Sequence, residues 1–150
     1  MVLQNDTEVA DQLGHRRSRI TIVLALYFIA GQAVYLGQPA HDPLRLVDKV
    51  RISAWLLWAV VLMIQFATNG GLFLSKSLRA LMNDEVTRAN RADAFLWGFW
   101  GAMLVAVALY FVSLFEPLAG REAIRTIVTI GLGAALLRFG ILEWRALKDG

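Results

Sequence analysis

The residues of this chain that could do chemistry are the polar side chains that interrupt its long apolar runs. Hydrocarbon offers no hydrogen-bond partner, so each of these groups must be satisfied inside a helix bundle or at an aqueous cavity. They are Gln32, Gln65, Thr68, Asn69, Tyr110, Ser113, Thr126, Thr129 and Arg138. The set contains no carboxylate. We therefore do not expect a proton-coupled exporter of the small multidrug type, which needs a titratable acid near the bilayer centre.

Arg138 is the member of this set that most needs an explanation. At 1.5 Å per residue it lies about 21 Å along its apolar run, and Gln65 reaches a similar depth in its own run. One hypothesis is that Arg138, Gln65 and Asn69 donate hydrogen bonds to an anionic ligand, a lipid phosphate or a carboxylate. Trp97 and Trp100 would then form the walls of the site. The alternative, which we favour, is that the Arg138 guanidinium reaches the cytoplasmic headgroups and needs no partner, with both tryptophans in an interfacial aromatic belt.

No pattern for catalysis or for a cofactor is present in the sequence. The serines have no histidine placed near them, and the motifs of serine hydrolases, phosphate loops and zinc peptidases are absent. The two histidines, His15 and His41, lie outside the apolar runs and so cannot serve haem or a pigment within a span. The chain has no cysteine, which excludes disulfides and thiolate metal sites. We expect no catalytic residue, no metal, no cofactor and no enzymatic activity.

The elements that carry these residues are predicted to cross a membrane. The chain is 57% hydrophobic and 18% charged, with a mean hydropathy of +0.54. Its net charge of +3 comes from basic residues spread between apolar runs, which does not favour nucleic-acid binding. Four runs are apolar on every face and close to the ~20 residues that a helix needs to cross a bilayer. Residues 1–150 are thus predicted to form one all-α membrane domain, a four-transmembrane-helix bundle with spans at 20–36, 52–74, 94–115 and 124–142.

The distribution of Lys and Arg predicts the orientation. About ten of them flank one side of the proposed spans and about five the other, so the positive-inside rule places both termini in the cytoplasm. Residues 1–19 and 143–150 then form cytoplasmic tails of a multi-pass protein of the cell (inner) membrane.

The connections between the spans differ in kind. Residues 37–51 read as a loop followed by a short amphipathic lead-in to the second helix, and 116–120 as a tight outer turn that makes the last two helices an antiparallel hairpin. The sequence leaves open whether the second helix continues past Gly71 or breaks into an interfacial helix.

Small residues at four-residue steps predict close helix packing, either within the chain or between chains. They are Gly98, Ala102 and Ala106 in the third span and Gly131 with Ala135 in the fourth.

Charged residues gather where the third helix is expected to begin. Asn83 suits a helix N-cap, and Asp84 and Glu85 suit the positive end of the helix dipole. Arg88 and Arg91 follow on the next turns. If the helix runs unbroken to the end of its span, these turns project into the cytoplasm, where the charges could bind a partner. Ion pairs between residues four apart on a solvated face explain the same residues without a partner.

The stretch Leu81-Met82-Asn83-Asp84-Glu85-Val86-Thr87-Arg88-Ala89-Asn90-Arg91, just before a span rich in Trp and Phe, resembles the Asp-Glu-x-Thr segment between helices 2 and 3 of small four-pass bacterial membrane proteins of unknown function. Some members of such families look like companions of a helix-turn-helix regulator. The resemblance therefore implies a regulatory or protein-binding role.

Two functions follow as hypotheses. The leading one is a non-enzymatic interaction or regulatory protein that presents Asp84, Glu85, Arg88 and Arg91 to a partner. The alternative is an oligomeric small transporter or channel subunit that binds an anionic or amphipathic molecule near Arg138. The expected partners are the lipid bilayer together with a further copy of the chain or a membrane or cytoplasmic protein.

Overall fold

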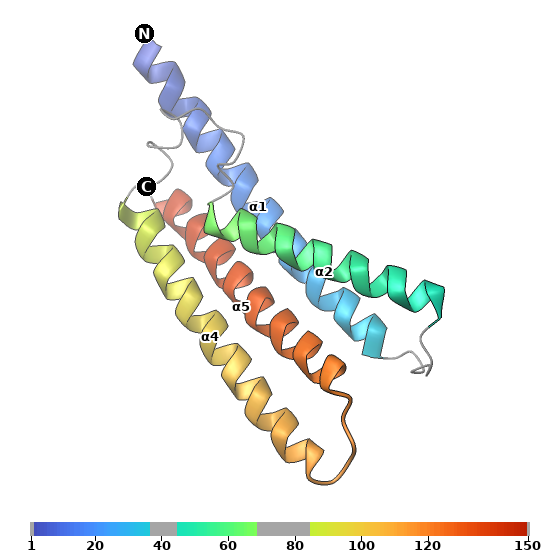
Figure 1. Cartoon of the computed structure of the whole chain (residues 1–150). Helices are drawn as coiled ribbons and strands as arrows, with labels where there is room; N and C mark the ends of the chain where they lie inside the picture. Colours follow the sequence, from blue (N-terminus) through green and yellow to red (C-terminus); the bar gives the residue numbers. More distant parts are fainter. Residues whose placement is uncertain (1, 37–44, 69–84, 150) are drawn as a thin grey trace.

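The computed structural model describes residues 2–36, 45–68 and 85–149, which form four α-helices (Figure 1). They are α1 (Val2–Leu36), α2 (Leu46–Ala67), α4 (Glu85–Ser113) and α5 (Gly120–Asp149). Each helix contains a segment long and apolar enough to cross a membrane, and these segments are Gly14–Tyr35, Leu46–Ala67, Glu85–Ser113 and Gly120–Ala146. The chain is an all-α four-helix bundle with the architecture of a multi-pass membrane protein, as the sequence predicts.

The helices extend beyond several of the predicted spans. α1 begins at Val2, so the predicted N-terminal tail is helical, and α5 continues to Asp149. No proline interrupts either extension. α2 begins at Leu46 and takes in the predicted amphipathic lead-in, and α4 is continuous from Glu85 to Ser113. The end of the second predicted span and the question of a break at Gly71 lie outside the described residues, as do Asn83 and Asp84.

Helix α5 is the centre of the bundle. It packs most extensively against α4 and α1, which lie on either side of it, while α2 crosses in front and packs less extensively against α5 (Figure 1). The start of α1, the start of α4 and the end of α5 lie at one end of the bundle, and the end of α1, the start of α2 and the turn between α4 and α5 lie at the other end (Figure 1). We call these the terminal end and the connection end.

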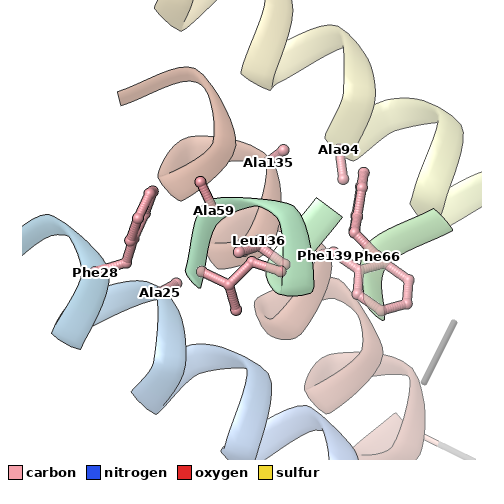
Figure 2. Close-up of a cluster of buried hydrophobic side chains, with 9 residues drawn as sticks. Ala25, Phe28, Ala59, Phe66, Ala94, Ala135, Leu136 and Phe139 are labelled. Atoms are coloured by element: carbon pink, nitrogen blue, oxygen red, sulfur yellow. The ribbon is translucent and has the colours of Figure 1, made fainter. Parts of the chain in front are cut away.

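The apolar core is small and lies where α2 crosses the other helices (Figure 2). The Phe66 ring lies 4.7 Å from that of Phe95 and 5.7 Å from that of Phe139, joining α2 to α4 and α5. Nearer the connection end, Phe28 of α1 stacks on Trp55 of α2 with ring centroids 6.2 Å apart. Most other large apolar side chains are exposed, which suits helices that face lipid and associate by close packing.

Glycine and alanine form the seam between α4 and α5. A Cβ added at Gly98 would lie 2.7 Å from the Ala135 Cβ and 2.8 Å from the Gly131 carbonyl oxygen, and one added at Gly131 would lie 2.9 Å from the Ala102 Cβ. The two backbones therefore approach as closely as side chains allow. The packing predicted from the small residues is confirmed, and it lies within one chain, in the predicted antiparallel hairpin.

Candidate functional site

A buried carboxylate, Glu143 of α5, joins three helices at the terminal end. Only 5% of Glu143 is exposed. Arg17 of α1 forms an ion pair with its Oε2, and the Thr87 hydroxyl of α4 donates to the same oxygen at 3.3 Å. The Asn90 amide donates to Oε1 at 3.1 Å. We call Arg17, Thr87, Asn90 and Glu143 the Glu143 cluster. Both oxygens of the carboxylate are satisfied, as a charge removed from water requires.

Helical spacing explains why these residues meet. Thr87, Asn90 and Ala94 are three and four positions apart, so they lie on one face of α4, and that face packs on α5. Glu143 likewise continues the buried face of α5 that includes Phe139 and Gly140. Glu143 was not predicted as a site residue, because it follows directly after the last predicted span. Its place in the three-and-four pattern of that span is the signal that could have found it.

Arg138 has a partner, contrary to the interpretation favoured from the sequence. Its Nε donates to Asp93 Oδ2 at 2.7 Å, and its guanidinium lies 5.3 Å from the Trp97 ring. Asp93 and Trp97 are four positions apart on α4, so both face Arg138 across the α4–α5 seam. The expectation failed because the position of Asp93 on the neighbouring helix is not visible in the spacing along the chain.

The remaining residues of the predicted ligand site are dispersed. Trp97 and Trp100 are both more than half exposed, as an interfacial belt requires, rather than walls of an enclosed site. Gln65 is half-buried on α2, and Asn69 lies outside the described residues.

The Arg138–Asp93 pair should contribute little to stability. Both side chains are about one-third exposed, and exposed ion pairs contribute about 0–1 kcal/mol. We expect Arg138→Gln to lower the free energy of unfolding by no more than about 1 kcal/mol, measured by denaturation in mixed detergent micelles. A loss as large as that expected for a fully buried pair would contradict this assignment.

The first turns of α4 present an exposed surface opposite the Glu143 cluster. Glu85, Arg88, Ala89 and Ala92 are all exposed and lie at the three-and-four spacing of one helix face, which we call the docking face. It borders an open hollow of about 460 Å³ that Arg91 and Phe95 also line.

Arg91, predicted to bind a partner, is half-buried and has a structural contact. Its Nη1 donates to the Ala67 carbonyl oxygen at 3.3 Å and so satisfies a carbonyl at the C-terminal end of α2. Asp84 lies outside the described residues, so only Glu85 and Arg88 of the predicted partner-binding set lie on the docking face.

A second buried polar group lies toward the connection end. Arg125 of α5 donates from Nε to Gln32 Oε1 of α1 at 2.8 Å, and the Gln32 amide donates to the Thr126 hydroxyl at 3.1 Å. The Arg125 guanidinium lies 3.5 Å from the Tyr35 ring centroid and 5.1 Å from that of Trp55. This group therefore links α1, α2 and α5.

Among the residues that the structure describes, no three His, Asp or Glu side chains lie close enough to hold a metal ion.

Comparisons of the chain with known protein families, with curated proteins and with solved structures gave no match.

Proposed function

We propose that this chain is a non-enzymatic protein of the inner membrane with an interaction or regulatory role, and that its docking face binds a protein partner in the cytoplasm. The observation that carries the proposal is the fixed position of the start of α4. One face of these turns is bonded to the buried Glu143, and the opposite face, with Glu85 and Arg88, is exposed beside an open hollow.

A fixed helix start is a good recognition element because little conformational entropy is lost when it binds. Thr87 and Asn90 hold the turn that carries Arg88, and Arg91 bonds α4 to the end of α2. The exposed charges on this turn would favour a partner with complementary charges and would fix the orientation in which it binds. The positive-inside count of Lys and Arg supports placing this end in the cytoplasm.

Ion pairs at the terminal end join the helices that carry the docking face. Arg17 of α1 pairs with Glu143 of α5, and Arg138 of α5 pairs with Asp93 of α4. These pairs support a fixed arrangement of the helices beside the docking face. The resemblance of residues 81–91 to companions of helix-turn-helix regulators agrees with a partner of this kind.

The test is charge reversal on the docking face. The tagged wild-type chain is extracted gently, and proteins that co-purify are identified by mass spectrometry. In the variant Glu85→Lys with Arg88→Glu, we expect recovery of the specific partner to fall about tenfold or more, because complementary charges become repulsive. The outer-turn variant Glu116→Lys with Arg121→Glu is the matched control, since both residues are exposed at the connection end.

Two results of this experiment would contradict the proposal. Unchanged recovery of the partner with the docking-face variant, or an equal loss of the partner with the outer-turn control, would show that the partner does not bind through Glu85 and Arg88. A photo-cross-linking residue placed at Ala89 should label the partner, whereas one at Val107, on the lipid-facing part of α4, should not.

A further inference from the structure

Arg125 is a buried positive charge with only uncharged partners. The residue is 7% exposed, and its Nε donates to the neutral amide of Gln32. The groups stacked against its guanidinium, Tyr35 and Trp55, are aromatic rings. Among the described residues, ion pairs join only Arg17 to Glu143 and Arg138 to Asp93. The half-buried Arg17 has a carboxylate partner, whereas Arg125 has none among the described residues.

Other buried hydrogen-bond donors on α5 and α2 are also unused. Within the described part of the chain, Arg125 Nη1, Trp55 Nε1 and the Thr129 hydroxyl are buried without a hydrogen-bond partner. Thr129 is fully buried and lies four positions after Arg125, so both are on the same face of α5. Trp55 approaches from α2. The Gln32 oxygen accepts from Arg125 Nε, and the Gln32 amide nitrogen donates to the Thr126 hydroxyl.

This combination points to one class of ligand. A buried donor without an acceptor destabilises the folded state in a low-dielectric interior. A guanidinium whose charge also has no counter-charge destabilises it further. An anionic oxygen group removes both costs at once, because it accepts several hydrogen bonds and carries the opposite charge. The planar guanidinium suits phosphate and carboxylate oxygens in particular.

We propose that Arg125, Thr129 and Trp55 form a binding site for an anionic oxygen group, a phosphate or a carboxylate, at the connection end of the bundle. Arg125 lies five residues after the start of α5, about 8 Å along the helix, near the level expected for lipid headgroups. The group therefore comes either from an anionic phospholipid or from a free oxyanion. The site lies at the opposite end from the docking face and does not depend on it.

The ligand reaches the donors by a small displacement of α2. This helix supplies Trp55 and packs less extensively against α5 than α1 and α4 do. Its contacts with α1 at this end are the ring contacts of Trp55 with Phe28 and of Trp58 with Tyr27. Aromatic contacts of this kind persist through small shifts because they have broad distance optima.

The experiment measures the unfolding temperature of the purified full-length chain in a neutral detergent. Three probes are titrated separately: short-chain phosphatidylglycerol, short-chain phosphatidylcholine and inorganic phosphate. We expect phosphatidylglycerol or phosphate to raise the unfolding temperature in a saturable way. A rise with phosphatidylglycerol alone identifies a lipid headgroup as the source, and a rise with inorganic phosphate identifies a free oxyanion.

Variants connect the effect to the site. Arg125→Gln should abolish the anion-dependent shift, whereas Arg121→Gln, which removes the same charge from an exposed position one turn earlier, should retain it. Thr129→Val removes one donor with little change of shape, and Trp55→Phe removes the indole N–H together with part of the ring. Each should weaken binding about tenfold. These two variants keep the test valid if Arg125→Gln does not fold.

Three results would overturn the proposal. The first is no shift of the wild-type chain with either anionic probe. The second is an equal shift with phosphatidylcholine and phosphatidylglycerol. The third is a loss of the shift in Arg121→Gln as large as in Thr129→Val and Trp55→Phe, which would indicate surface charge and not the buried donors.

Discussion

Replacing Glu143 with glutamine is expected to lower the free energy of unfolding by about 3–5 kcal/mol, the cost of breaking a buried ion pair by removing one partner. The Glu143 side chain is 6% exposed and that of Arg17 14%, so water cannot compensate for the lost carboxylate. Glutamine has nearly the same shape, so a packing defect would not account for the loss. Unfolding in mixed micelles of a mild detergent and sodium dodecyl sulfate, followed by circular dichroism, measures the difference.

Two further variants make this result specific. Glu116→Gln removes an exposed carboxylate at the outer turn and should change stability by less than about 0.5 kcal/mol. The double variant Arg17→Met with Glu143→Leu should recover part of the loss, because apolar replacements of both partners are often neutral but Thr87 and Asn90 still lose their shared acceptor. If Glu143→Gln is as stable as Glu116→Gln, the ion pair does not hold α1 to α5.

Replacing Gly98 with leucine should separate α4 from α5. The first carbon of the new side chain would already lie 2.7 Å from the Ala135 Cβ and 2.8 Å from a backbone oxygen of Gly131, and the backbone atom cannot turn aside. We expect a loss of about 3 kcal/mol or more in the same unfolding assay, at the upper end of what overpacking costs. Disulfide cross-linking between cysteines introduced across the seam should also slow.

The matched control for Gly98→Leu is Gly31→Leu. Gly31 lies in α1, also inside a membrane segment, and a Cβ there meets nothing within 4 Å. The free energy of unfolding of the Gly31→Leu variant should be unchanged or slightly raised, because glycine is a poor helix former. Equal losses at both positions would mean that helix propensity or lipid contact, and not the seam, explains the Gly98 effect.

The parts of the fold that the sequence predicted are those determined by the chain's own pattern. Runs of this length that are apolar on every face are expected to form helices in hydrocarbon. Because the turn between α4 and α5 is short, these two helices must lie side by side and antiparallel. The stripe with Gly98 and Gly131 indicated close packing because small residues at four-residue steps form a flat face. The sequence left open whether the helix that carries Arg88 runs unbroken into its span, and the structure shows that it is continuous from Glu85 to Ser113.

The polar contacts could not be predicted in the same way, because each one depends on the rotation of two helices about their axes. Arg138 was expected to reach the headgroups without a partner, whereas the structure pairs it with Asp93 across the seam. The burial of Arg125 against Gln32 depends on how α1 packs beside α5. Rotating one helix about its axis by about 100°, the angle between successive residues, would separate Arg138 from Asp93 or Arg125 from Gln32.

The Glu143 cluster has a consequence for how the bundle is made. Arg17 and Glu143 stand 126 residues apart, so the first helix leaves the ribosome long before the carboxylate that fixes it has been synthesised. α1 must therefore remain inserted without this contact until α5 has been synthesised. Nascent chains arrested before α5 should remain a set of separate inserted helices, and closure of the bundle should require the synthesis of α5.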